Sequence, residues 1–315
     1  MQRYSTVLLA TAAAIILGSM LLSVYLDPYR IVHPLLGEFS FEPNSRVSKL
    51  EFLMRECGRF DSYFFGDSRA VTLSDRDLPD VKGHRFYNFS TPADNVRSIL
   101  PRLKFLLDSG CPVTAVVADV SLDVLLDQDQ INRYSLLLTE SPKLSGESRT
   151  SFYSRYFLSA QALSGYFSAR LRAPSTHDIY FSDGHAEYLW AMPDGSSFAL
   201  PRCGAPSLTT VQRALLAGML PAYRELARLA QQHHFAAIVW IAPMNRSENS
   251  LLRDPDVSAF VTQLRAIPEL RVVEPDWNSA LLADYREWHD CGHFRRSVFD
   301  RLIAPAVSQL MLKAD

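Results

Sequence analysis

Residues 62–68 of this chain read SYFFGDS, and they decide the fold. The first four residues form a continuous apolar and aromatic run, which is typical of a strand buried on both faces of a parallel sheet. Gly66 permits a tight turn after the strand, and a helix is expected to begin near Arg69. Functional groups of open α/β sheets gather just beyond the carboxyl ends of the strands. The sequence therefore predicts that Ser68 lies at the mouth of such a sheet.

Four further short runs resemble buried strands, and they alternate with amphipathic helical patterns. The expected strands lie at residues 85–89, 113–118, 236–241 and 271–273. Helices are expected at residues 96–107, 210–232 and about 296–313. This alternation predicts an α/β domain with a mainly parallel central sheet and helices on both sides of it.

The first residues form a long apolar segment. No charged residue occurs from Thr6 to Leu26, and about 20 such residues cross a bilayer as a helix. Arg3 precedes the segment and Asp27 follows it, so the N-terminus is expected to stay in the cytoplasm and the remainder to be exported. We interpret residues 1–26 as an uncleaved transmembrane anchor. A cleaved signal peptide, with its shorter apolar region of ~7–15 residues, and a buried core helix are the alternatives.

The composition narrows the class of protein. Hydrophobic residues make up 48% of the chain and charged residues 21%, close to an average globular protein. The net charge of -2 lacks the basic excess that non-specific nucleic-acid binding requires. The sequence contains no Cys-x-x-Cys motif and no Cys/His cluster with zinc spacing,. We therefore expect no nucleic-acid partner, no metal and no cofactor.

Two segments depart from the alternation of strands and helices. Residues 27–55, with Pro28, Pro34 and Pro43, are interpreted as an extended stalk or as an arm packed on a domain at residues 56–315,. Residues 120–209 form a long aromatic-rich insertion after the third strand. Insertions of that length are usually functional lids or subdomains. The alternative is a second hydrophobic cluster that only covers the sheet.

A second stretch with chemical potential follows the last expected strand. Residues 288–294 read WHDCGHF, in a polar loop before the last helix. A serine hydroxyl is a weak nucleophile, so it needs a base within hydrogen-bond reach and a carboxylate that fixes the tautomer of that base. His293 and Asp290 can supply both to Ser68, and the spacing to Asp290 favours His293 over His289. On its own, a Gly-Asp-Ser triplet is also typical of a turn with an N-cap serine.

Three motifs in this order resemble the first, second and fifth conserved blocks of the SGNH hydrolase superfamily. They are GDS at residues 66–68, NFS at residues 88–90 and Asp290-x-x-His293-Phe294. The chain is similar to bacterial cell-envelope proteins such as alginate O-acetyltransferases and the D-alanine transfer protein of teichoic acid. The resemblance covers roughly residues 60–310 and implies a three-layer α/β/α SGNH-like fold. It implies Ser68 as nucleophile, His293 as general base and acid, and Asp290 as the residue that orients the base.

The resemblance also implies an oxyanion hole, the group of N–H donors that stabilises negative charge developing on the substrate. It would use the backbone N–H of Ser68 and a second N–H near Ser90. The usual third donor is an asparagine after the third strand, but residues 118–123 read ADVSLD and contain none. Asn88 and Asn245 are the candidate replacements. Loss of one such donor typically lowers turnover ~100- to 1000-fold.

The chain contains four cysteines, which is compatible with an oxidising compartment,. In the SGNH strand order the first and third strands are neighbours. Cys57 and Cys111 lie just before these two strands, so the resemblance allows a disulfide between them. A Cys203–Cys291 disulfide would tie the insertion to the loop that carries His293. Four cysteines allow three connectivities, and free buried thiols are the alternative.

These features predict a membrane-anchored SGNH-type serine O-acyltransferase, with acetyl as the expected group, or an acylesterase. The resemblance implies an acyl donor, a cell-envelope or exported polysaccharide as acceptor, and a multi-spanning membrane acyltransferase as partner. The expected location is the bacterial inner membrane, with one span and the catalytic domain in the periplasm. The alternative is a catalytically weak scaffold or glycan-binding subunit of a polysaccharide-modification complex.

Overall fold

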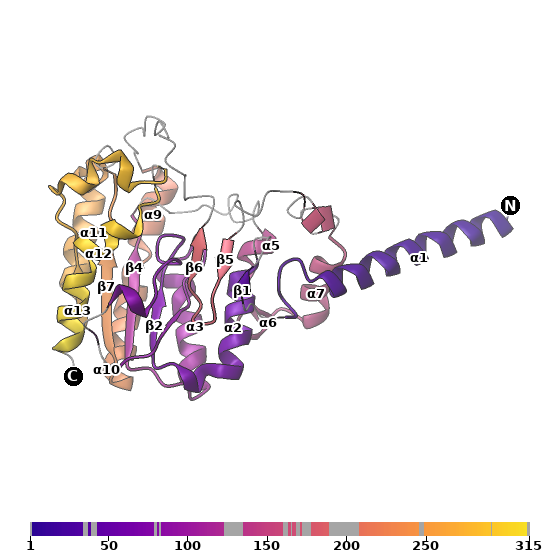
Figure 1. Cartoon of the computed structure of the whole chain (residues 1–315), viewed down its shortest axis with the longest axis horizontal. Helices are drawn as coiled ribbons and strands as arrows, with labels where there is room; N and C mark the ends of the chain where they lie inside the picture. The colour runs from indigo at the N-terminus through magenta and orange to yellow at the C-terminus, as the bar shows by residue number, and fades with distance from the viewer. Residues whose placement is uncertain are drawn as a thin grey trace.

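Five parallel strands form the central sheet of the protein. Figure 1 shows the whole chain as a computed structural model. The structure describes residues 2–33, 37–38, 43–78, 81, 83–122, 135–159, 163–164, 166–167, 171, 178–188, 208–245, 249–290 and 292–313. The strand order is β3-β2-β4-β7-β8, and every neighbouring pair is parallel. The strands are β2 (Ser62–Phe65), β3 (Phe86–Asn88), β4 (Ala115–Val120), β7 (Ala236–Ile241) and β8 (Leu270–Val273). All five expected strands are confirmed, and their carboxyl ends meet at one edge of the sheet.

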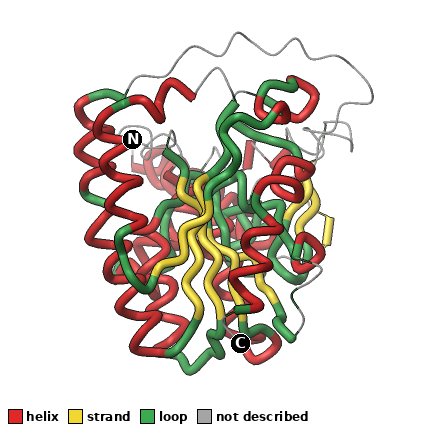
Figure 2. The backbone as a smooth tube through the Cα atoms, turned by 90° about the vertical axis from the view of Figure 1, so that its left-hand side faces the viewer, coloured by secondary structure: helices red, strands yellow, loops and turns green. Residues whose placement is uncertain are grey.

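Helices lie on both sides of this sheet, as Figure 2 shows. Along β2, Tyr63 and Phe65 face one hydrophobic cluster and Phe64 faces another, because successive side chains of a strand point to opposite faces,. The first cluster is covered by α2 (Ser45–Glu56), α3 (Val96–Asp108), α9 (Thr210–Ala217), α10 (Leu220–His233) and α11 (Pro255–Arg265). The second is covered by α12 (Arg296–Leu302) and α13 (Ala304–Leu312). The domain therefore has three layers, α/β/α.

The helix expected to begin near Arg69 is absent, since residues 68–72 form turns instead. Two other helices expected from the sequence are each interrupted. The pattern at residues 210–232 gives α9 and then α10, and the pattern at residues 296–313 gives α12 and then α13. Pro221 and Pro305 are the second residues of α10 and α13. Because proline has no N–H and clashes with the preceding turn, it begins a helix more readily than it continues one.

The arm after the first helix is packed on the domain over its described part, so the stalk alternative does not hold there. The side chain of Asn44 caps α2 by accepting the N–H of Val47 at 3.0 Å. Leu50, Phe52 and Leu53 of this helix belong to the same core cluster as α3. The domain thus begins earlier in the chain than the sequence indicated.

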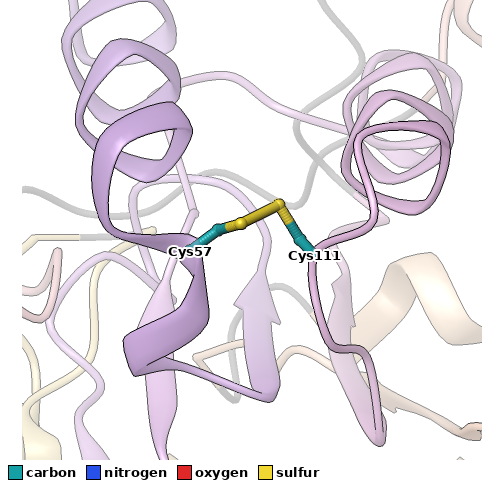
Figure 3. Close-up of a disulfide and its surroundings, with 2 residues drawn as sticks. All are labelled: Cys57 and Cys111. Carbon is teal, nitrogen blue, oxygen red and sulfur yellow. A yellow bond between two sulfur atoms is a disulfide. The ribbon is translucent and has the colours of Figure 1, made fainter.

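The disulfide between Cys57 and Cys111 is confirmed, with Cα atoms 5.5 Å apart (Figure 3). Cys57 follows α2 and Cys111 follows α3, close to the amino ends of the neighbouring strands β2 and β4. The bond therefore ties the arm to the sheet at the edge opposite to Ser68. Cys203 and Cys291 lie outside the described residues.

The helices and strands named within the insertion after β4 lie in two segments. Residues 135–159 contain α5 (Ser135–Leu138), α6 (Pro142–Ser145) and α7 (Arg149–Phe157). Residues 178–188 contain β5 (Asp178–Tyr180) and β6 (Ala186–Tyr188), which form an antiparallel sheet with β1 (Gly37–Glu38). A separate cluster joins the insertion to the arm instead of covering the central sheet, and it consists of Tyr29, Ile31, Val47, Phe152 and Tyr156.

Helix α1 (Gln2–Leu26) projects away from the domain (Figure 1). The most apolar 18 residues of the span Arg3–Leu26 have a mean hydropathy of 2.4 and are almost entirely exposed, so by length and composition the span can cross a membrane,. Tyr4 and Tyr25 lie near its two ends with 84% and 82% of their surface exposed. Tyrosine is enriched where membrane spans meet water. The buried-core-helix alternative is therefore wrong, and the helix is a candidate membrane span.

Asp27 closes the turn directly after this helix. Its carboxylate accepts the backbone N–H groups of Ile31, Val32 and His33 at 2.9, 3.1 and 2.7 Å. The side chain is buried, with 1% of the residue exposed.

Short 3-10 helices complete the described elements: η1 (Cys57–Arg59), η2 (Asp75–Asp77), η5 (Asn249–Arg253), η6 (Ala280–Leu282) and η7 (Tyr285–Glu287).

Candidate active site

Ser68, His293 and Asp290 form a continuous hydrogen-bonded chain. Ser68 Oγ lies 2.7 Å from His293 Nε2, although the two residues are 225 positions apart. His293 Nδ1 lies 2.9 Å and 3.0 Å from the two carboxylate oxygens of Asp290. The structure thus brings together the three residues that the sequence singled out. His289, the alternative base, instead donates its backbone N–H to the carbonyl oxygen of His293 at 2.8 Å.

The turn that carries Ser68 is packed too closely for any residue but glycine at position 66. A Cβ atom on Gly66 would lie 2.5 Å from Asp119 Cγ. Asp119 accepts the N–H of Asp67 at 3.1 Å, and the Asp67 side chain accepts the N–H of Arg69 at 2.8 Å. Among the described residues, nothing accepts the N–H of Ser68. This leaves the Ser68 N–H as a donor for a bound substrate.

Asp119 lies in residues 118–123, the segment in which the SGNH resemblance leads us to expect an asparagine. Only 2% of the residue is exposed. Burial, and then the neighbouring Asp67 carboxylate, raise the pKa of Asp119 well above its usual range. Since its oxygens accept the Asp67 N–H, Asp119 supports the nucleophile turn and does not replace the missing oxyanion donor.

The loop that carries His293 is a short hairpin fixed on the core. Trp288 and Phe294 form an antiparallel bridge, and both are buried in the cluster that contains Trp240 of β7. Inside the loop, Asp290 Oδ1 accepts the N–H of His293 at 2.7 Å. Burial raises the pKa of Asp290, but the hydrogen bond and charge of His293 outweigh burial and lower that pKa to about 2. Asp290 is therefore ionised at neutral pH and can stabilise a protonated His293.

Arg69 joins the two segments of the site, and the sequence did not single it out. Its Nε donates to the carbonyl oxygen of Gly292 at 2.5 Å. The residue is 5% exposed. Because Arg69 follows Ser68 and Gly292 precedes His293, this bond helps to fix the distance between Ser68 and His293.

No family model, curated protein or solved structure matches this chain. Within the part of the chain that the structure describes, no group of three or more His, Cys, Asp or Glu side chains could hold a metal ion.

Asn88 and Ser90 have partners that the sequence did not anticipate. Asn88 Nδ2 lies 2.7–3.1 Å from three carbonyl oxygens in residues 70–73, the segment that follows the nucleophile. Asn88 Oδ1 accepts the N–H of Ser90 at 2.9 Å. Neither the Asn88 amide nor the Ser90 N–H is free to donate to a substrate, so both support the turn instead. Asn245 follows β7 at the same edge of the sheet as Ser68, 8% exposed, and stays a predicted donor.

The loop after β3 contains a donor that the sequence did not reveal. No described residue accepts the N–H of Ala93. The same loop contacts the nucleophile turn, because Thr91 donates its N–H to Gly66 O at 2.9 Å. Ala93 has a φ of 54°, a left-handed conformation that favours glycine, asparagine or aspartate. Nothing in an alanine codes for that conformation, which explains why sequence reasoning missed it.

Proposed function

We propose that the protein is a membrane-anchored SGNH-type serine O-acyltransferase or acylesterase. The observation that carries this proposal is the contact of 2.7 Å between Ser68 Oγ and His293 Nε2, with Asp290 bound to the opposite nitrogen of the ring. Nucleophile, base and orienting carboxylate are recognised by these mutual roles and not by their positions in the chain. A purely structural domain has no physical need for all three.

In the proposed reaction, Ser68 Oγ attacks the carbonyl carbon of an acyl ester while His293 Nε2 takes the hydroxyl proton. The N–H groups of Ser68 and Ala93 stabilise the oxyanion of the tetrahedral intermediate. The C–O bond of the donor ester then breaks, and His293 returns the proton to the leaving alcohol. A sugar hydroxyl or water attacks the acyl-serine with His293 as base, which releases the new ester or the free acid and restores Ser68.

The substrates and location follow from the resemblance and from α1. We propose acetyl as the transferred group, a cell-envelope or exported polysaccharide as acceptor, and a multi-spanning membrane acyltransferase as the partner that supplies acyl groups. The candidate span supports a membrane location. Arg3 before the span favours a cytoplasmic N-terminus, which would place the domain in the periplasm of a bacterial inner membrane.

Hydrolysis of p-nitrophenyl acetate by the full-length protein in detergent tests the catalytic proposal. Ser68→Ala should abolish hydrolysis, whereas the exposed Ser109→Ala should leave it unchanged. A fluorophosphonate probe followed by peptide mapping should modify Ser68. Equal hydrolysis by wild type and Ser68→Ala, or modification of a different serine, would support the scaffold alternative instead.

A second measurement separates transfer from hydrolysis. The acyl-enzyme formed from p-nitrophenyl acetate is offered soluble oligosaccharides, and the products are examined by mass spectrometry. Acetylated oligosaccharide that depends on Ser68 would indicate an acyltransferase. Free acetate as the sole product would indicate an esterase, since the two activities differ in whether water is excluded from the acyl-serine.

A further inference from the structure

Three basic side chains from α2 and α3 donate to the carbonyl groups of the loop at residues 89–93. Lys49 Nζ lies 2.7 Å from the carbonyl oxygen of Ser90. Arg102 Nη1 lies 3.3 Å from the carbonyl oxygen of residue 89. Arg46 Nη2 lies 3.3 Å from the carbonyl oxygens of both residue 92 and residue 93. Four of the five carbonyl groups in this loop therefore face these cations.

The direction of these carbonyl groups determines the direction of the N–H groups that follow them. A trans peptide unit points its C=O and the next N–H to opposite sides. The Ser90 carbonyl faces Lys49, and the N–H of Thr91 points the other way and donates to Gly66 O at 2.9 Å. The side of the loop opposite to Lys49 is thus the side of the nucleophile turn.

The same reasoning applies to the donor proposed for the oxyanion. The carbonyl of Pro92 faces Arg46, so the following N–H, that of Ala93, points away from Arg46. This is the N–H for which the described residues offer no acceptor. Lys49 and Arg46, which bind the carbonyls of Ser90 and Pro92, therefore leave the N–H groups of Thr91 and Ala93 pointing away from themselves.

Lys49 differs from the two arginines in its partners. Arg102 is paired with Asp94 at 2.6 Å, and Arg46 is paired with Glu140 at 2.9 Å. No carboxylate in the described part of the chain lies within ion-pair distance of Lys49 Nζ. Among the described residues, Lys49 Nζ is hydrogen-bonded only to the carbonyl oxygen of Ser90.

Lys49 is also an expensive residue to bury at this position. It is 4% exposed. Burial, and then the positive charge of Arg102, lower the pKa of Lys49 to about 7 in spite of the carboxylates of Asp183 and Asp94. An apolar side chain of similar length would avoid the cost of removing an amine from water. Buried groups with perturbed pKa values next to a catalytic site are candidates for function.

We infer that Lys49 is a positioning residue of the acyl-transfer site: by holding the Ser90 carbonyl it keeps the loop against the turn that carries Ser68, so that the N–H of Ala93 faces the oxyanion. The inference rests on the proposed function of Ser68. Lys49 touches no reacting atom and acts through residues 89–93. Its contribution therefore belongs to the charged transition state and not to binding of the neutral ester.

The test compares Lys49→Met and Lys49→Arg with a matched control, Lys143→Met, in the full-length protein. Lys143 of α6 pairs at 2.8 Å with Glu51 of α2, the helix that carries Lys49, and among the described residues it has no hydrogen bond to the loop. Four quantities are measured: kcat and KM for p-nitrophenyl acetate, the inhibition constant of phenylboronic acid, and Tm. Phenylboronic acid forms a tetrahedral anion on a reactive serine, so its affinity reports the oxyanion site.

Lys49→Met should lower kcat about 10- to 100-fold, since it misplaces an oxyanion donor without deleting it. KM should stay within about twofold because ground-state binding is untouched. The inhibition constant of phenylboronic acid should rise by the same factor as kcat falls, while Tm at pH 7 does not fall. Lys49→Arg keeps a cationic donor and should retain more of kcat than Lys49→Met, and Lys143→Met should resemble the wild type.

Unchanged kcat and inhibition constant in Lys49→Met would overturn the inference, as would a fall in kcat without weaker binding of phenylboronic acid. If Lys49→Met does not fold, Lys49→Gln replaces it, since glutamine has a shorter side chain that keeps an N–H donor. The same two comparisons with the wild type are then made: the change in kcat and the change in the inhibition constant of phenylboronic acid. A wild-type protein without Ser68-dependent hydrolysis overturns the proposed function and this inference with it. Wild-type hydrolysis with an unaffected Lys49 variant overturns this inference alone.

Discussion

Replacing Gly66 by alanine perturbs the nucleophile turn by a known distance. The added Cβ would lie 2.5 Å from Asp119 Cγ and 2.7 Å from Ala70 Cβ. Non-bonded carbon atoms prefer separations of about 3.5–4.0 Å, so the turn and Asp119 must move apart by roughly 1 Å. A displacement of that size at a catalytic group costs about 100-fold in rate. Overpacking of a filled site lowers the free energy of unfolding by about 1–3 kcal/mol. Each kcal/mol corresponds to a fall of roughly 2–4 °C in Tm.

We therefore expect Gly66→Ala to lower kcat for p-nitrophenyl acetate about 100-fold and to lower Tm by several degrees. Gly58→Ala is the control, because a Cβ there has no neighbouring atom within 4 Å. Asp119→Ala removes the Asp119 atoms that the new methyl group meets and leaves only the close contact with Ala70 Cβ, so it should cost less stability in the Gly66→Ala protein than in the wild type,. Wild-type kcat in Gly66→Ala, or equal losses in both glycine variants, would refute the steric argument.

Two further predictions concern charge. Asp290→Asn keeps an oxygen for the loop N–H groups but no longer fixes the tautomer of His293 or stabilises its protonated form, so kcat should fall about 10⁴-fold. Asp284→Asn, whose partner Arg286 is exposed, should have no effect on hydrolysis. The pKa of Lys49 is about 7 in the folded protein and 10.5 ordinarily, so between these values the unfolded chain binds the extra proton. Stability should fall as pH falls through this window, by at most ~1.4 kcal/mol per pH unit. Thermal unfolding should therefore give a Tm difference between Lys49→Met and wild type that is largest near pH 7 and shrinks by pH 10; a difference independent of pH contradicts the buried charge.

The strands could be predicted because a strand buried on both faces consists of consecutive apolar residues, and such a run is visible in the sequence itself. The segments at residues 62–65 and 236–241 are continuous apolar runs, and β2 and β7 begin and end at those residues. The residues of the candidate site could also be predicted from the sequence, since a serine that acts as a nucleophile needs a base and a carboxylate. Asp290 and His293 have the required types, order and spacing.

Other features depend on contacts between distant segments, and a local pattern does not contain them. The role of Asn88 depends on three carbonyl groups of another turn, which become neighbours only after β2 and β3 pair. Likewise, Lys49 lies in a helical stretch without a distinctive pattern, and its partner is a backbone carbonyl that has no sequence signature. The left-handed Ala93 is imposed by the loop around it and not by its own preference,.

The packed arm also determines how far the protein can reach. The candidate span ends at Leu26, and Tyr29 already belongs to the cluster that packs against α7. The three residues from Leu26 to Tyr29 span at most about 10 Å. The domain therefore lies directly next to the end of the candidate span, without a flexible linker between them. If α1 lies in a bilayer, Ser68 stays within one domain's width of the membrane surface, and the polysaccharide that we propose as acceptor must reach it there.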